Sequence, residues 1–270
     1  MIEINLQKLN YEFLVNLDYG ETLKVITDTN SFYFRVFLKP ESKKLLVHSN
    51  GAINRNIKSP PVFHRSSWTE DIDANCVFID DKTIHNTEYK AGWGIGTSNE
   101  HYIESYSEII KHFQQILGIQ SKDIYYWGSS AGGFMSMMLA TRHIETTAIV
   151  GNPQTDLRRH NKTKLRNLIL HGYGNVDVDE ISQNEGFRFS VVESIIKFNY
   201  MPKIVYIQNT IFKSDVNKQL NPFLKDLKER SISEEDLHII NYRDDLRGHL
   251  PLPKNDYLFF LKLAMNFNEI

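Results

Sequence analysis

The sequence contains a single cysteine, Cys76, among its 270 residues. One cysteine excludes an intramolecular disulfide framework and a cage of several thiolate ligands around a metal, and we assign no metal site. Its place in the apolar run NCVFID predicts a buried, unreactive thiol. No stretch approaches the roughly 18 apolar residues of a membrane-spanning helix, and the first ten residues, MIEINLQKLN, lack the pattern of a secretory signal. We therefore expect a cytoplasmic protein with no membrane span.

An excess of charge of one sign is also missing. The 31 Lys and Arg residues nearly balance 33 Asp and Glu residues, which gives a formal net charge of −2. This balance excludes the basic footprint of a nucleic-acid-binding domain. With 41% apolar residues, the chain can bury a sizeable core. Because neither an internal repeat nor a low-complexity linker divides it, we expect a single domain over residues 1–270.

Alternating and continuous apolar runs predict the strands. The alternation near the start predicts N-terminal antiparallel strands within residues 1–40, at 11–17, 23–27 and 32–38. After Pro40 the runs become short and continuously apolar, which is typical of strands buried on both faces. These later strands are expected at 43–49, 75–80, 123–128, 146–151, 203–208 and 237–242.

Helical stretches are expected between and after these strands, at 99–117, 132–143, 216–229 and 255–268. The alternation of strand and helix predicts an α/β fold with a doubly wound, mostly parallel sheet and helices on both sides. One segment departs from it. Residues 153–200 are charged and helix-like, and we interpret them as a small, cap-like insertion over the ends of the sheet.

The stretch from Asp123 to Ala140, DIYYWGSSAGGFMSMMLA, joins a buried strand directly to a helix. It contains G-x-S-x-G with Ser130 at the centre. A serine at such a sharp turn needs small neighbours, because the strand and helix backbones pass close to each other there. We predict that Ser130 is a nucleophile and that the side chain of Ser129 faces elsewhere. The alternative interpretation is a tight turn of small residues without chemistry.

A serine nucleophile needs a base within hydrogen-bond reach, oriented in turn by a carboxylate. Both should follow the serine in the chain, each on a loop after a later strand. His249, in DDLRGHLPLP after the last strand, is the expected base. The expected acid is Asp215, the first carboxylate after the strand at 203–208, which could also cap the following helix. Asp244 and Asp245 are competing acids.

Backbone N–H groups should stabilise the oxyanion that forms when the serine attacks. One is expected from Ala131, and a second from Gly51 or Ala52 in the segment SNGAINR. A plain Asn-Gly turn is the alternative interpretation of that segment. We assign Trp93 and Asn50 to substrate binding, with Trp93 as part of a pocket wall.

At these residues the chain resembles the α/β-hydrolase fold, and within it the compact bacterial members associated with capsule and glycan biosynthesis. The resemblance covers residues 45–258. It rests on the motifs NGA (50–52), FHRSSW (63–68), GWGIG (92–96), GSSAGG (128–133), NPQTD (152–156), SDVNKQLNPF (214–223) and GHLPLP (248–253). It implies a nucleophile at Ser130, an acid at Asp215, a base at His249 and an oxyanion pocket near Gly51, Ala52 and Ala131.

The resemblance implies serine-dependent acyl transfer through an acyl-serine intermediate. The first expectation is O-acetyl transfer to, or ester hydrolysis on, a capsule-type polysaccharide, with acetyl-CoA as a possible acyl donor and no bound cofactor. The alternatives are a carboxylesterase for small esters and a non-catalytic partner in glycan assembly. A homo-oligomer is also possible. Basic side chains in the insertion could face an anionic glycan or the phosphates of CoA, or form a solvated helix face: Arg158, Arg159, Lys162, Lys164 and Arg166.

Overall fold

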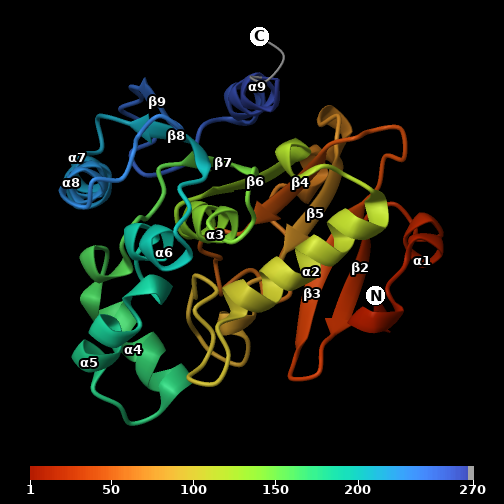
Figure 1. Ribbon diagram of the computed structural model, residues 1–270, viewed down its shortest axis with the longest axis horizontal. Helices are drawn as coiled ribbons and strands as arrows, with labels where there is room; N and C mark the ends of the chain where they lie inside the picture. Colours follow the sequence, from red (N-terminus) through yellow and green to blue (C-terminus); the bar gives the residue numbers. More distant parts are fainter. Residues whose placement is uncertain (267–270) are drawn as a thin grey trace.

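The computed structural model describes residues 1–266, and within them nine strands form one mixed sheet (Figure 1). The strand order is β1-β2-β3-β5-β4-β6-β7-β8-β9. The strands are β1 (Ile2–Asn5), β2 (Glu21–Ile26), β3 (Ser31–Phe37), β4 (Leu45–Ser49), β5 (Asn75–Ile79), β6 (Ile124–Ser129), β7 (Thr147–Gly151), β8 (Lys203–Asn209) and β9 (Leu237–Tyr242).

The helices alternate with these strands along the chain. They are α1 (Tyr11–Val15), α2 (Tyr102–Leu117), α3 (Ala131–Ala140), α4 (Lys162–Tyr173), α5 (Val178–Asn184), α6 (Val191–Phe198), α7 (Lys213–Asp215), α8 (Asn221–Glu229) and α9 (Lys254–Met265). A π-helical turn, 216–220, joins α7 to α8. The expected helices are therefore confirmed, although residues 267 and 268 of the last one lie outside the described part.

All strand pairs from β5 to β9 are parallel, whereas β3 is antiparallel to both of its neighbours, β2 and β5. The central strands β4, β5 and β6 are buried at every residue. This burial explains why their sequences read as continuous apolar runs. The expected fold class, a mostly parallel α/β sheet with additional antiparallel pairing at the N-terminal end, is confirmed.

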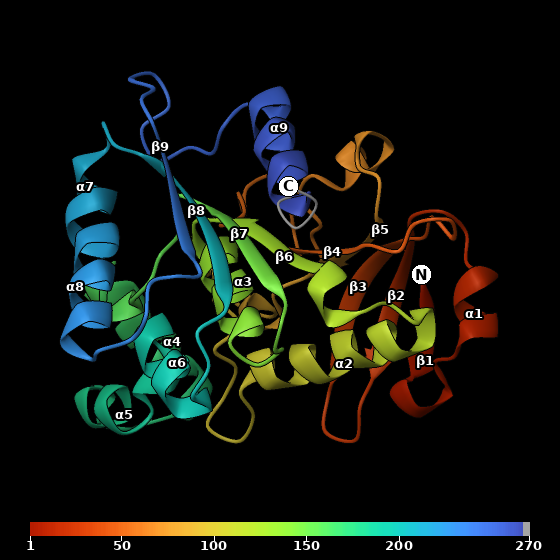
Figure 2. The same cartoon turned by 45° about the horizontal axis from the view of Figure 1, so that its top comes forward.

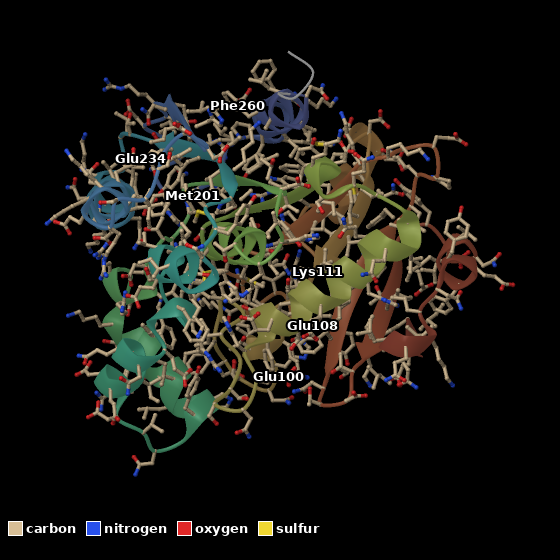
Figure 3. All side chains as sticks on the ribbon, viewed as in Figure 1. Glu100, Glu108, Lys111, Met201, Glu234 and Phe260 are labelled. Carbon is tan, nitrogen blue, oxygen red and sulfur yellow. The ribbon has the colours of Figure 1, made fainter. Side chains whose placement is uncertain are left out.

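The hydrophobic core consists mainly of two clusters, one on each face of the sheet. On one face α2, α3, α6 and α8 pack against the sheet, and on the other α9 covers the centre (Figure 2). α2 shows the sequence basis of this layering. Its buried side chains include Ile103, Ile110 and Phe113, whereas Glu108 and Lys111 lie on the side away from the sheet (Figure 3).

The prediction of a strand at 11–17 is wrong. Residues Tyr11–Val15 form α1, because the side chain of Asn10 caps the helix by accepting a hydrogen bond from the Phe13 backbone N–H at 2.9 Å. The edge strand is instead β1, which the sequence pattern did not indicate and which pairs parallel with β2. The N-terminal strands are thus only partly antiparallel.

Residues 153–200 are helical, with α4, α5 and α6 (green to teal in Figure 1). Because α6 contacts α3 and packs against the sheet, α4 and α5 are the part that corresponds to the expected insertion. Among residues 1–266, none of the helices is long and apolar enough to cross a membrane. The expected thiol is buried: Cys76 is 1% exposed, and burial raises its pKa to about 12.

Candidate active site

Ser130 is the single residue between β6 and α3. Its backbone has a conformation that residues other than glycine rarely adopt. Its φ is 56° and its ψ is −121°. Such a backbone is strained for a residue with a Cβ atom, and the surrounding structure must hold it in place. The turn at Ser130 is therefore a constrained feature at the carboxyl edge of the sheet, as the G-x-S-x-G motif predicts.

The glycines on either side of Ser130 allow this turn to form. A Cβ atom on Gly128 would lie 2.4 Å from the backbone of Gly132, and one on Gly132 would lie 2.2 Å from the carbonyl oxygen of Ser49. Both distances are far below van der Waals contact. The motif therefore requires glycine at these positions because backbones meet there, which is the steric reason that the sequence suggested.

Three side chains from distant parts of the chain meet at the turn. The Nε2 atom of His249 lies 2.8 Å from the Oγ atom of Ser130, and the Nδ1 atom of His249 lies 2.5 Å from the Oδ2 atom of Asp215. Asp215 is 7% exposed. The structure thus brings together the serine, the imidazole and the carboxylate that the sequence suggested, in one hydrogen-bonded chain.

Two asparagines at strand ends hold the loop that carries His249. Asn209, the last residue of β8, donates from Nδ2 to the carbonyl oxygens of Asp244 and Gly248 at 2.8 and 3.0 Å. Asn152, directly after β7, donates to the carbonyl oxygen of Leu250 at 3.3 Å. Because the anchors are at the carboxyl ends of parallel strands, the imidazole is delivered to the edge where Ser130 projects.

The competing interpretations of the acids can be compared directly. Asp244 accepts hydrogen bonds from the backbone N–H groups of Leu246 and Arg247, so its carboxylate stabilises its own turn rather than His249. The expected capping role of Asp215 is absent, since its side chain makes no cap hydrogen bond to the helix that follows. Within the described residues, Asp215 is the carboxylate bonded to the His249 ring.

The side chain of Ser129 faces away from this chain of hydrogen bonds. Its Oγ atom accepts from Nη2 of Arg65 at 2.9 Å. The Arg65 guanidinium lies over the rings of Tyr257, Trp68 and Trp127, at 4.8 to 5.5 Å from their centroids. Arg65 therefore supports the strand end behind the turn.

The expected oxyanion donors differ in how closely they approach Ser130. Ala131 is the first residue of α3, so its N–H has no acceptor within the helix. Ala52 lines the same pocket as Ser130 and Ala131, whereas Gly51 does not and instead passes close to the carbonyl oxygen of Ser129. Of the two alternatives in the Asn-Gly segment, Ala52 has the better position. The assignment of an oxyanion site to Ala131, Ala52 and Gly51 stays a prediction.

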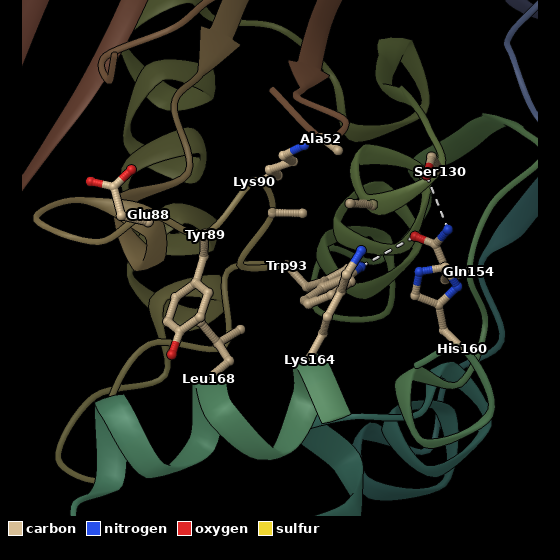
Figure 4. Close-up of a pocket in the computed structure, with 12 residues that line it drawn as sticks. Ala52, Glu88, Tyr89, Lys90, Trp93, Ser130, Gln154, His160, Lys164 and Leu168 are labelled. Atoms are coloured by element: carbon tan, nitrogen blue, oxygen red, sulfur yellow. Dashed lines mark hydrogen bonds between the residues drawn. The ribbon is translucent and has the colours of Figure 1, made fainter. Parts of the chain in front are cut away.

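A pocket of about 320 Å³ opens beside Ser130 (Figure 4). Its wall combines the turn, the loop at 88–93 and helix α4 of the insertion. Trp93 contributes to the wall, as expected from the sequence, and is 4% exposed. The remaining lining residues are Ala52, Glu88, Tyr89, Lys90, Ala91, Ala131, Gln154, His160, Lys164 and Leu168.

The structure gives Asn50 a different position from the one expected for a substrate-binding side chain. Asn50 is 3% exposed and is absent from the pocket wall. Its Nδ2 donates to the Val62 carbonyl oxygen, and its Oδ1 accepts from the His64 N–H at 2.8 Å. We correct the substrate-binding assignment of Asn50 to a structural one, because its amide holds the loop at 62–64.

The basic residues of the insertion divide into two groups. Arg158 pairs with Asp156 and Glu193, and Arg159 pairs with Asp226, so both arginines are engaged within the chain. Lys164 lines the pocket beside Ser130, and Lys162 and Arg166 line a separate surface hollow. Of these five basic residues, Lys164 is thus the one that lines the pocket beside Ser130.

Two pocket residues were missed by sequence reasoning. His160 lies in the charged insertion and the sequence assigns it no role, yet it lines the pocket, where burial and then the nearby His249 lower its pKa. Gln154 donates from Nε2 to the Ser130 Oγ atom at 3.0 Å. A signal was available for Gln154, since it closely follows a strand of the parallel sheet, where site residues gather.

Comparison with known proteins adds structural likeness only. The chain matches no protein-family model and no curated protein. Among solved structures, the capsule O-acetyltransferase of Neisseria meningitidis serogroup A is similar over 96% of this chain and 100% of its own, with a TM-score of 0.67 and 13% identity. The chain has the α/β-hydrolase fold.

Two further structures support this conclusion. A His-to-Ala mutant of the same Neisseria enzyme in complex with CoA is similar over 93% of this chain and 99% of its own, with a TM-score of 0.64 and 14% identity. An S-formylglutathione hydrolase from Agrobacterium tumefaciens is similar over 93% of this chain and 96% of its own, with a TM-score of 0.60 and 15% identity. At these identities the likeness establishes the fold.

Proposed function

We propose that the chain is an enzyme that transfers an acyl group through an ester on Ser130, with His249 as general base and Asp215 as its orienting acid. The observation that carries the proposal is the chain of hydrogen bonds from Asp215 through His249 to Ser130, at 2.5 and 2.8 Å, at a strained turn. A structural turn would not need an imidazole and a nearly buried carboxylate from two other loops.

The proposed reaction has two halves. In the first, His249 Nε2 takes the proton of Ser130 while Oγ forms a bond to the acyl carbon, and the protonated imidazole then gives that proton to the departing alcohol or thiol. In the second, His249 takes a proton from an acceptor hydroxyl or water, whose oxygen bonds to the acyl carbon. The Ser130 oxygen leaves and regains its proton from His249.

Backbone N–H groups are proposed to stabilise the negative oxygen in both halves. The candidates are Ala131 at the start of α3, with the positive end of the helix dipole behind it, and Ala52 across the pocket. The loss of one such donor typically slows a reaction about 10²- to 10³-fold.

The leading substrates are acetyl-CoA as acyl donor and a hydroxyl group of a capsule-type glycan as acceptor. The support is the likeness to a capsule O-acetyltransferase, one structure of which contains CoA. Lys90 and Lys164 add two cations to a largely apolar pocket wall (Figure 4). Hydrolysis of a small ester by the same side chains is the second candidate, supported by the likeness to an S-formylglutathione hydrolase.

Mass spectrometry after incubation with acetyl-CoA and candidate oligosaccharides tests the proposal. We expect an acetylated sugar and free CoA with the wild type, and neither with Ser130→Ala. Ser136→Ala is a matched control, because Ser136 lies buried in the same helix α3 and, in the described residues, its Oγ has no hydrogen-bond partner. This control should retain activity.

The outcomes separate the candidate functions. Free acetate without acetylated sugar, lost in Ser130→Ala, would indicate an esterase. A folded wild type that turns over neither acetyl-CoA nor simple aryl esters would contradict the enzyme and favour the non-catalytic role in glycan assembly.

A further inference from the structure

We propose that Gln154 is a further catalytic residue of this site, which donates a hydrogen bond to the nucleophilic oxygen of Ser130. It would hold the hydroxyl group with its proton toward His249 and stabilise the negative charge that develops on Oγ when this proton leaves. The inference rests on the proposed function and adds a side chain outside the serine, histidine and aspartate.

The atoms that meet at Ser130 Oγ define which of them donates. The Nε2 atom of Gln154 lies 3.0 Å from Ser130 Oγ, and His249 Nε2 lies 2.8 Å from the same oxygen. An amide nitrogen can only donate, so Oγ accepts from Gln154 and keeps its single proton for His249. A hydrogen bond that favours the charged form of a group lowers its pKa. Gln154 thus favours the alkoxide in the same geometry that directs the proton to the base.

Trp93 fixes the orientation of the amide. Its indole Nε1 lies 3.2 Å from Gln154 Oε1 (dashed in Figure 4). Because an indole N–H is a donor only, the amide must present its oxygen to Trp93, and its nitrogen is left for Ser130. Both side chains are almost fully buried, with Gln154 1% and Trp93 4% exposed. Water therefore competes little for either bond.

The Trp93 backbone is itself held in a strained conformation, with φ at 55°. The N–H groups of its two neighbours, Gly92 and Gly94, donate to the carboxylate of Asp81 at 2.8 and 3.2 Å. Asp81 is 5% exposed. One buried carboxylate thus clamps the loop on both sides of the indole that orients Gln154.

The backbone of Gln154 is anchored as firmly. Its N–H donates to the carbonyl oxygen of Ser130 at 3.3 Å. The next two N–H groups, of Thr155 and Asp156, both donate to Oε1 of Gln219, at 2.7 and 3.1 Å. A side chain fixed through its own amide and through the backbone around it is suited to place one donor at one atom.

Rates of labelling by a fluorophosphonate, which needs only a reactive serine, test the inference without the natural substrate. We expect Gln154→Leu to react at least tenfold more slowly than the wild type while keeping its melting temperature within a few degrees. In Gln154→Glu the new carboxyl can donate only while it is protonated. The labelling rate of this variant relative to wild type should therefore fall as pH rises from 5 to 8.

Trp93→Phe keeps a ring in the pocket but removes the N–H that orients the amide. We expect a smaller loss of labelling rate than in Gln154→Leu. If Trp93 acts through Gln154, the double variant should react no more slowly than Gln154→Leu alone. Losses that simply multiply would overturn the role given to Trp93.

The results distinguish this inference from the proposed function. A labelled wild type together with a folded Gln154→Leu that reacts at the same rate overturns the role of Gln154 and leaves the proposed function standing. Should Gln154→Leu not fold, a Gln154→Glu rate that keeps a constant ratio to wild type across pH overturns it. A folded wild type without labelling contradicts the proposed function itself.

Discussion

The turn at Ser130 and the insertion at 153–200 border the same pocket, but different interactions hold them. All ten residues of α3 are buried, and backbones meet at Gly128 and Gly132 without room for a side chain. The insertion buries one side of α4 and relies on ion pairs such as Arg158 with Asp156. Backbone contact thus fixes the turn that carries Ser130, whereas ion pairs between side chains help to hold the insertion.

The largest effect on activity is expected at Asp215, the carboxylate bonded to the His249 ring. Asp215→Asn should lower kcat about 10⁴-fold, because an amide in place of the carboxylate no longer fixes the imidazole tautomer or stabilises its charge. Asp244→Asn is the matched control. Within residues 1–266, the Asp244 carboxylate contacts its own turn, and Asn can keep the hydrogen bonds from Leu246 and Arg247 while losing the weak ion pair with Arg247. Steady-state kinetics of both variants check this, and equal losses would contradict the assignment of the acid.

Next in size is the close approach of backbones behind Ser130. Gly132→Ala should lower the free energy of unfolding by about 3 kcal/mol or more, because the new Cβ would lie 2.2 Å from Ser49 O. The comparison is Gly118→Ala, where nothing lies within 4 Å of the new Cβ. There φ is +63°, unlike at Gly132, so only the backbone strain of about 1 kcal/mol is expected. Urea unfolding of the two variants measures the difference; similar losses would mean that the contact is not tight.

The insertion should respond to loss of its ion pairs more weakly. Arg158→Met removes the nearer cation of the Asp156 carboxylate, whose side chain is 5% exposed, and also the ion pair with Glu193. Arg159 Nε remains 3.9 Å from Asp156, and we expect a loss of stability of about 2 kcal/mol. Arg159→Met breaks a more exposed pair with Asp226 and should cost less than about 1 kcal/mol. Urea unfolding midpoints rank the two, and the reverse order would refute this account of the insertion.

The smallest expected effect is a loss of stability at low pH that comes from His143, just after α3. Burial lowers the pKa of His143 to about 4, and its ring contacts Tyr126 and Gln114. The unfolded chain binds a proton near pH 6.5 that the folded chain refuses, so stability is lost as pH falls from about 6.5 to 4. We expect a loss of about 0.8 kcal/mol at pH 6, relative to pH 8, that His143→Gln does not show. Identical pH dependence in the two proteins would rule this out.

The sequence could predict those features of the fold and of the site that depend on local patterns. The strands at the centre of the sheet and the residues Ser130, Asp215 and His249 follow from local patterns: continuous apolar runs, a glycine-serine motif and loops after strands. The structure brings these three residues together. Their catalytic roles stay a proposal.

Other features depend on contacts that a linear pattern does not carry. The helix at Tyr11–Val15 was missed because one cap by Asn10 outweighed an alternating pattern. The amide of Gln154 gains its place from Trp93, 61 residues away in the chain, and Asn50 is taken from the pocket by its bonds to the loop at 62–64. Such partners become visible only when distant loops are in place.

The most direct test of the central claim is to locate a fluorophosphonate adduct by peptide mass spectrometry. We predict one adduct, on Ser130, which is absent from Ser130→Ala and is kept in Ser136→Ala. A folded wild type that forms no adduct at neutral pH, or an adduct that persists in Ser130→Ala, would contradict the claim that this hydroxyl is the nucleophile.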